Sequence, residues 1–310
     1  MDNNFFADSS RRLHYSKDPA VIHFHGQYWM YYSLPPKLFW RKFLSPKNKR
    51  VWGIGIATSS DLITWKILGE LDITMPYEQR GICAPGIILK NNQIHLFYQT
   101  YGNGPKDAIC HAISEDGINF QRNLTNPIIR ASGDWNNGRA IDADVIIYEN
   151  KIFCYWATRD PKGEMQMLGV STASEDSAWM RNDWTQACNS PILKPELMWE
   201  QKCIEAPAVC LHDNKFFMFY GGAYNNSPQQ IGCATSSDGY HWQRLGFEPF
   251  LSNGLMGTWN HSESGHPFVF SDVDGKTYLF FQGNNDLGKT WWLSWKEIHW
   301  KDGKPYLKDN

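Results

Sequence analysis

One unit that occurs five times along the chain constrains the fold more than any other feature of the sequence. Each copy contains a polar or small residue, a short apolar segment, a turn and an aromatic segment. The five copies are KDPAVIHFHGQYWMYYS from Lys17, CAPGIILKNNQIHLFYQT from Cys83, IDADVIIYENKIFCYWAT from Ile141, IEAPAVCLHDNKFFMFYGG from Ile204 and GHPFVFSDVDGKTYLFFQG from Gly265. Internal repeats of this kind are typical of folds that stack one structural unit several times.

Each copy has the sequence pattern of a β-hairpin. Its two apolar segments are rich in Val, Ile, Tyr and Phe, which favour strands. The residues between them are of the types that form tight turns between antiparallel strands. The predicted turns are His25-Gly26, Asn91-Asn92, Glu149-Asn150, Asp213-Asn214 and Asp274-Gly275.

A second repeated element predicts a third strand in most units. It is ATSSDLITW from Ala57, AISEDGINF from Ala112, STASEDSAW from Ser171 and ATSSDGYHW from Ala234. One more short strand follows, which gives four antiparallel strands in each unit. We therefore predict an all-β, five-bladed β-propeller that forms a single domain over residues 1–310, with blades starting near residues 17, 83, 141, 204 and 265. Long helical patterns are absent, which disfavours an α/β fold.

Composition excludes several kinds of partner. The 310 residues include 30 Lys or Arg and 32 Asp or Glu, so there is no basic excess and we expect no nucleic-acid partner. No apolar stretch is long enough to predict a membrane span. The seven cysteines form no CxxC pair, which excludes zinc-ribbon and thioredoxin-like chemistry. The N-terminus has no secretory signal pattern, so we expect a cytoplasmic protein, or a periplasmic or secreted one if a signal peptide was removed.

The residues that open the first strand of each unit are the candidates for function. They are Asp18, Ala84, Asp142, Glu205 and His266, separated by 66, 58, 63 and 61 residues. In a propeller these strands line the central channel, so three carboxyl groups are expected to converge there. Convergence of like charges is unfavourable. A purely structural axis would carry Ser, Gly or apolar residues, although a single acid in such a place could simply cap a strand.

Glycoside hydrolysis requires a protonated carboxyl group and an ionised carboxylate at one site. Asp18 lies beside Lys17, which favours its ionised form and the role of general base. Glu205 has apolar neighbours, which favour its protonated form and the role of general acid. Asp142 is left to modulate the pKa of the acid, with Asp144 as a rival because it lies two residues further along the same strand.

The ordered segments DPAV, CAPGI, IDADV, IEAPAV and GHPFV resemble those of glycoside hydrolase family 43 and the related five-bladed propeller glycosidases. The resemblance extends from about Lys17 to Trp300. It implies Asp18 as general base, Asp142 as pKa modulator and Glu205 as general acid, with inversion at the anomeric carbon. It also implies that His266 lies near the axis, where family members often hold a calcium ion or ordered waters, and that no other cofactor is required.

The second unit departs from the family pattern. Family members commonly have Trp-Ala-Pro there, whereas this chain has Cys83-Ala84-Pro85. The missing Trp removes a stacking surface, so specificity for xylan or arabinan does not follow from the resemblance. Fructosides and anhydro-galactosides remain open, although the first unit lacks the Asn-Asp-Pro-Asn segment of fructosidases.

Further residues are predicted to contact sugar from the rim of the channel. Trp40 lies in the basic segment 34–50, and Trp135 and Arg139 lead into the third unit. Trp259 precedes the fifth unit, and Glu263 lies three residues before His266. Arg159-Asp160-Pro161 resembles a fructosidase tripeptide, but its position predicts a turn.

The favoured function is that of an inverting, exo-acting glycosidase for short plant or algal oligosaccharides, similar to arabinofuranosidases and xylosidases. The short loops and the lack of an appended carbohydrate-binding module favour small substrates over polymers. The alternatives are a carbohydrate-binding propeller without catalysis, a related propeller glycosidase for fructosides or anhydro-galactosides, and a scaffold. A binding module or a scaffold has no need of a proton donor, so the three acids favour the enzyme.

Overall fold

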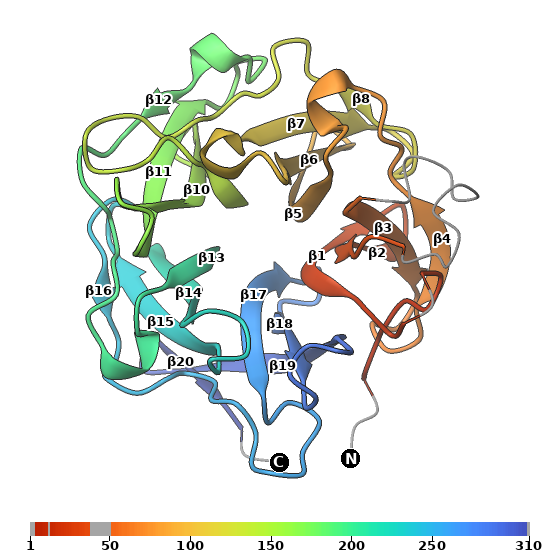
Figure 1. Cartoon of the computed structure of the whole chain (residues 1–310), viewed down its shortest axis with the longest axis vertical. Helices are drawn as coiled ribbons and strands as arrows, with labels where there is room; N and C mark the ends of the chain where they lie inside the picture. The colour runs from red at the N-terminus through yellow and green to blue at the C-terminus, as the bar shows by residue number, and fades with distance from the viewer. Residues whose placement is uncertain (1–3, 12, 38–50, 309–310) are drawn as a thin grey trace.

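Five four-stranded sheets surround a central axis in the computed structural model, which describes residues 4–11, 13–37 and 51–308 (Figure 1). Within each sheet the strands are antiparallel and follow one another in chain order, the first lying at the axis and the fourth at the periphery. The predicted all-β, five-bladed propeller is therefore confirmed. In the described part of the chain, no helix has both the length and the apolar character needed to cross a membrane.

The five blades have the following strands. Blade one contains β1 (Lys17–Phe24), β2 (Gln27–Leu34), β3 (Gly53–Ser59) and β4 (Lys66–Glu70). Blade two contains β5 (Ile82–Lys90), β6 (Gln93–Thr100), β7 (Ile109–Ser114) and β8 (Gln121–Arg122). Blade three contains β9 (Ile141–Tyr148), β10 (Lys151–Arg159), β11 (Gln166–Ser174) and β12 (Thr185–Gln186). Blade four contains β13 (Ile204–His212), β14 (Lys215–Gly222), β15 (Gln230–Ser236) and β16 (Gln243–Arg244). Blade five contains β17 (Glu263–Ser271), β18 (Thr277–Asn284), β19 (Trp292–Lys301) and β20 (Lys304–Leu307).

The ring closes between blade five and blade one. Each innermost strand contacts the innermost strands of both neighbouring blades, and β17 contacts β1. The N-terminal segment adds to this closure, because the backbone N–H of Phe6 donates to the carbonyl of Leu293 at 2.9 Å and the Leu293 N–H returns a bond at 2.8 Å. The two ends of the chain are thus joined through β19.

The inner hairpins have the turns that the sequence predicted in four of the five blades. His25-Gly26, Asn91-Asn92, Glu149-Asn150 and Asp213-Asn214 all have positive φ at both residues. This is the backbone of the tight turns that match the twist of two antiparallel strands. In blade five the connection is longer, because the N–H of Asp272 bonds the carbonyl of Lys276 and only Gly275 has positive φ.

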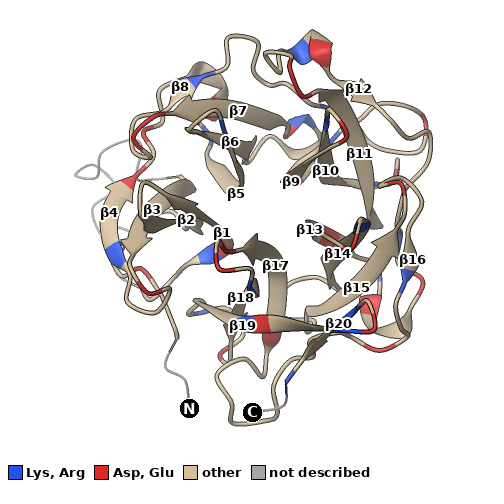
Figure 2. Ribbon diagram, turned by 180° about the vertical axis from the view of Figure 1, so that it is seen from behind, with Lys and Arg blue, Asp and Glu red and all other residues tan. Residues whose placement is uncertain are grey.

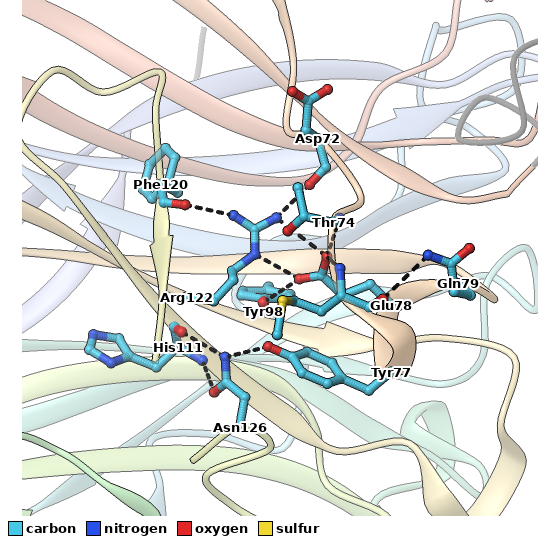
Figure 3. A network of polar contacts seen from close by, with 11 residues as sticks. Asp72, Thr74, Tyr77, Glu78, Gln79, Tyr98, His111, Phe120, Arg122 and Asn126 are labelled. Atoms are coloured by element: carbon cyan, nitrogen blue, oxygen red, sulfur yellow. Dashed lines mark hydrogen bonds and ion pairs between the residues drawn. The ribbon is translucent and has the colours of Figure 1, made fainter. Parts of the chain in front are cut away.

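A buried carboxylate anchors the entry into blade two. Glu78 ends the 3-10 helix η2 (Pro76–Glu78), and none of its surface is exposed. Its carboxylate accepts hydrogen bonds from Nε of Arg122 at 2.7 Å and from the Tyr98 hydroxyl at 2.6 Å (Figure 3). It also accepts from the backbone N–H of Thr74 at 2.9 Å.

Blade four contains the same arrangement at its entry. Glu200 ends the 3-10 helix η5 (Met198–Glu200) and accepts from Tyr220 and from Arg244, both at 2.8 Å. In each of the two blades the arginine comes from the outermost strand and the tyrosine from the second strand. The buried acid therefore ties the segment that enters the blade to both of these strands.

We predict that Arg122→Met destabilises the fold by about 3–5 kcal/mol, because it leaves the Glu78 charge buried and without its cation. Urea unfolding measures the change. Lys215→Met, which alters an exposed cation on β14, is expected to have little effect. The double variant Glu78→Gln/Arg122→Met removes both charges and is expected to recover part of the loss. An Arg122→Met protein as stable as the parent would show that the pair has no structural importance.

Candidate active site

All five innermost strands share a break in their pairing where they begin. In β1, for example, Lys17 pairs with Ser33 and Ala20 pairs with Tyr31. Two residues of β1 between these pairs therefore lie opposite a single residue of β2. The other four blades have the same shift. One residue in each break has a left-handed backbone. These residues are Asp18 (φ 52°), Ala84 (φ 47°), Asp142 (φ 53°), Ala206 (φ 51°) and His266 (φ 44°).

This geometry corrects the sequence alignment in blade four. We expected Glu205 to be equivalent to Asp18, but Glu205 pairs with Gly221 before the break, and Ala206 has the left-handed backbone. Glu205 is therefore equivalent to Lys17 and Cys83. A signal for this was present in the sequence, since EQRGICAP from Glu78 and EQKCIEAP from Glu200 align without a gap.

The left-handed residues bond to side chains from the preceding blade. Each break leaves a backbone N–H outside the strand pairing, and a buried N–H requires an acceptor. The N–H of Asp18 donates to Oε1 of Gln282 at 3.1 Å, and that of Asp142 to Oε1 of Gln99 at 2.7 Å. The N–H groups of Ala84 and His266 donate to Ser33 and Gln229, both at 2.8 Å.

The structure brings Asp18, Asp142 and Glu205 together at the axis. Only 7–8% of the surface of each remains exposed. The pKa of Asp142 is raised to about 7, mainly by burial and also by the charges of Glu205 and Asp18, while His266 acts in the opposite direction. The cause is that a buried site resists holding several negative charges at once. Nδ1 of His266 lies 3.2 Å from Oδ1 of Asp18.

Three side-chain amides hold Glu205 in place. Oε1 accepts from Nε2 of Gln229 at 2.7 Å and from Nδ2 of Asn225 at 3.2 Å. Oε2 accepts from Nε2 of Gln166. Gln229 also binds the His266 N–H, so one amide connects the carboxylate of blade four to the backbone of blade five.

Lys17 is a cation that interacts with the acids, and basic and acidic segments lie together where β1 begins (Figure 2). Burial alone would lower the pKa of Lys17, but Asp18 and Glu263 outweigh it and the pKa rises to about 12. Its ammonium donates to Asn225 and lies 4.4 Å from the ring centroid of Trp291. Lys17 therefore remains charged and offsets part of the negative charge of the site.

Glu263 belongs to the same polar network. It is fully buried, and it accepts from the N–H of Asn226 at 2.6 Å and from Nε2 of Gln282 at 2.8 Å. Burial raises its pKa to about 7, against the lowering effect of Lys17. The structure thus places Glu263 beneath the rim, beside Lys17, rather than on the rim as predicted.

The two candidate modulators, Asp142 and Asp144, face different parts of the molecule. Oδ2 of Asp144 accepts from the backbone N–H of Val209 at 2.7 Å, which ties β9 to β13. Burial raises the pKa of Asp144 to about 7, and no charge of the acid group contributes to that shift. The break at Asp142 interrupts the alternation of faces, so only Asp142 joins the other acids.

Aromatic residues that the sequence analysis did not single out lie beside Lys17. Tyr15 lies 6.0 Å from Trp52 and 6.1 Å from Trp291, and Trp52 lies 5.6 Å from Tyr101, between ring centroids. Aromatic walls with a few convergent polar groups are typical of ligand pockets. Tyr15 precedes β1, and the other three rings lie in the connections between the second and third strands of blades one, two and five. None of them belongs to the repeated strands, so the repeat gave no signal for them.

Packing accounts for two of the predicted sugar contacts. The Trp135 ring stacks on Trp156 of β10 at 6.0 Å, and the Trp259 ring lies 5.7 Å from Phe281 of β18. Trp199 stacks on Tyr220 at the same point of blade four. Each of these three tryptophans precedes the left-handed residue of its blade by seven positions, which marks a repeated structural role.

Arg139 remains near the acids, because its charge lowers the pKa of Asp142. Trp40 lies outside the described residues.

The predicted calcium site does not fit the residues present. Calcium prefers several oxygen ligands, whereas His266 offers nitrogen and faces the Asp18 carboxylate. Among residues 4–11, 13–37 and 51–308, no group of three or more His, Cys, Asp or Glu side chains is arranged to hold a metal ion.

Comparison with known proteins supports this architecture. The sequence profile described as Glycosyl hydrolases family 43 matches residues 14–305. A thermostable family-43 glycoside hydrolase has a TM-score of 0.75 at 21% identity, over 95% of this chain and 93% of that one. An endo-1,4-beta-xylanase from Bacteroides thetaiotaomicron has a TM-score of 0.73 at 20% identity, over 97% and 96%. An alpha-L-arabinofuranosidase from Lactobacillus brevis has a TM-score of 0.67 at 17% identity, over 94% and 93%. At these identities the structural likeness shows the fold.

We predict that the free energy of unfolding falls as the pH rises from about 4 to about 7, because the raised pKa values of Asp142, Asp144 and Glu263 let the folded chain keep protons that the unfolded chain has lost. Each group contributes a slope of up to about 1.4 kcal/mol per pH unit. Urea unfolding across this range measures the slope. Asp144→Asn is expected to reduce it, and the exposed control Asp134→Asn is expected to leave it unchanged. Equal slopes in Asp144→Asn and the parent would contradict the assignment.

Proposed function

Since the chain belongs to glycosyl hydrolases family 43 and is a glycosidase, we propose that hydrolysis takes place at the axial acids, with Asp18 as general base and Glu205 as general acid. Asp142 modulates the pKa of the general acid, because its own charge changes when it gains or loses a proton. The single observation that carries this proposal is the convergence of three carboxyl groups whose charges affect one another in a buried site.

The surroundings of the acids support a division of roles. Asp18 lies next to Lys17, whose positive charge stabilises a negative carboxylate, and its Oδ1 lies 3.2 Å from Nδ1 of His266. A negative carboxylate is what a general base needs to accept a proton from water. Glu205 is held from both oxygens by amides that fix its direction. A fixed carboxyl group can deliver its proton to the glycosidic oxygen as the bond breaks.

The substrate class proposed is a short plant or algal oligosaccharide, cleaved from its end with inversion. The names of two structural neighbours, a xylanase and an arabinofuranosidase, support sugars of the pentose type. Cys83 lies at the site, where burial raises its thiol pKa and the charges of Asp18 and Asp142 raise it further. A small thiol there leaves space that a larger ring would fill, so the sugar accepted can differ from that of the relatives.

A binding module without catalysis is disfavoured by the acids themselves. Keeping three carboxyl groups buried close together lowers stability, as the raised pKa of Asp142 shows. A sugar-binding site needs hydrogen bonds, which Asn or Gln side chains would supply without that electrostatic strain.

We predict that Glu205→Gln lowers kcat for unactivated oligosaccharides by about 100- to 10,000-fold, the range expected for loss of general acid–base catalysis. The loss should be much smaller for dinitrophenyl glycosides, because that leaving group departs without a proton. Steady-state kinetics on nitrophenyl and dinitrophenyl arabinofuranosides and xylosides measure the difference. Asp18→Asn should lower both rates, because water still requires a base.

The exposed variant Glu164→Gln is the matched control and should keep the parent rate. Unfolding curves of each variant show that the fold is retained. If Glu205→Gln loses the same factor on both leaving groups, Glu205 is not the proton donor. A fully active Asp18→Asn would remove Asp18 from the mechanism.

The proposed mechanism also predicts the anomer of the first product. Water activated by Asp18 attacks the face of the sugar opposite the leaving group, so the configuration inverts. Proton NMR of the anomeric signals during the first minutes of hydrolysis reports that configuration before mutarotation. Retention would assign Asp18 the role of nucleophile instead.

A further inference from the structure

A cavity rich in positive charge lies beside the acids, between the loops of blades two and three. Its volume is about 480 Å³, which lies in the range of small-molecule sites. Arg139, Arg159 and Lys162 line it together with one acid, Asp107. Three cations therefore face a single carboxylate. No role in the proposed hydrolysis requires this excess of positive charge.

Two of the cations that line the cavity interact with the acid group. Arg139 lowers the pKa of Asp142 by its charge. Nε of Arg159 donates to Oε1 of Gln166 at 3.1 Å, and the amide nitrogen of Gln166 donates to Glu205. A substrate whose scissile bond lies at the acids would therefore extend outward past both arginines.

The Arg139 guanidinium has no hydrogen-bond partner among the residues that the structure describes. Its side chain is 15% exposed, and Nε is buried without a partner. The nearest carboxylate oxygen, Oδ2 of Asp107, is 3.9 Å away, and the other oxygen of Asp107 binds Asn103 at 3.1 Å. A guanidinium that is largely removed from water without partners is unfavourable, and an acceptor in the cavity would correct this.

The guanidinium of Arg159 also has unfilled hydrogen-bonding capacity. Its guanidinium lies 5.7 Å from the ring centroid of Tyr224, and in the described part of the chain only Nε has a hydrogen-bond partner. Its two terminal nitrogens are available to a ligand. Lys162 is exposed at the edge of the same cavity. Guanidinium groups bind carboxylate and sulfate oxygens with paired hydrogen bonds.

We propose that this cavity binds the oxyanion of an acidic sugar, a uronic acid carboxylate or a sulfate ester, in the part of the substrate next to the scissile bond. The inference rests on the proposed function and narrows its substrate to acidic oligosaccharides. A neutral sugar would leave the Arg139 guanidinium without a hydrogen-bonded anion, since the Asp107 carboxylate is 3.9 Å away. The carboxylates at the axis repel the oxyanion, so it is directed outward and the substrate binds in one orientation.

Isothermal titration with D-glucuronate, D-galacturonate, D-galactose 6-sulfate and neutral D-galactose tests the proposal. We expect the anionic sugars to bind at least about tenfold more tightly than galactose, with affinity falling as salt is added. The comparison of uronates with the sulfate ester identifies which oxyanion the cavity takes. Equal affinity for galactose and all three anionic sugars would overturn the proposal.

Charge variants locate the binding. Arg139→Gln is expected to weaken anion binding about tenfold or more, and Lys162→Glu, a surface change that does not threaten folding, should weaken it as well. Arg181→Gln and Lys215→Glu alter exposed cations that do not line the cavity, and they should bind as the parent does. Unchanged affinity in both Arg139→Gln and Lys162→Glu would reject the site.

Binding is measured without turnover, so the two proposals can fail separately. The titration is repeated in Glu205→Gln, which lacks the proposed proton donor. If aryl glycosides are hydrolysed but the anionic sugars do not bind, the acidic-substrate inference fails and the hydrolytic function stands. If the anionic sugars bind but Glu205→Gln hydrolyses as fast as the parent, the binding site stands and the catalytic assignment fails.

Discussion

The left-handed residue at the start of each innermost strand is the constraint on which the rest of the structure depends. Such a backbone costs about 1–3 kcal/mol for a residue other than glycine, and it removes an N–H from the strand pairing. In four blades the acceptor for that N–H is a side chain of the preceding blade, such as Gln282 for Asp18 and Gln99 for Asp142. The same bonds therefore close the ring and aim the acids at the axis.

The charge balance of the site follows from this closure. Four carboxyl groups meet near the axis, and Lys17 and His266 are the basic groups in direct contact with their network. Burial is the main reason why the pKa values of Asp142 and Glu263 rise to about 7, and the charge of neighbouring carboxylates adds to it. A site that holds protons near neutral pH is suited to general acid–base catalysis, which needs both a donor and an acceptor at the same pH.

The sequence predicted the features that depend on local residue patterns. It did not predict the features that depend on contacts between separate strands and loops. The blades, their order and four of the five tight turns followed from strand and turn propensities. The sequence alignment placed Glu205 one residue away from its true equivalent, because it matched polar residues with one another. The break in the strand occurs instead at the Ala-Pro pair that follows Glu205. Trp135 was interpreted as a sugar contact because its stacking partner, Trp156, lies on another strand. Tyr15 and Trp52 were missed because they lie outside the repeat.

The acids lie at the axis and the cations of the cavity lie outside it, and this separation connects the fold to the substrate proposed. Residues in the inner strands are fixed by the ring and supply the acids at the axis. The loops that leave the blades are free to vary without disturbing the ring. In this chain Arg139 comes from the segment that leads into blade three, Arg159 from the end of β10 and Lys162 from the loop that follows it. Because Gln166 contacts both Arg159 and Glu205, an anion bound at Arg159 would lie one side chain away from the proposed proton donor. Gln166 of blade three is thus the side chain through which the proposed substrate recognition and the proposed proton donation would be linked.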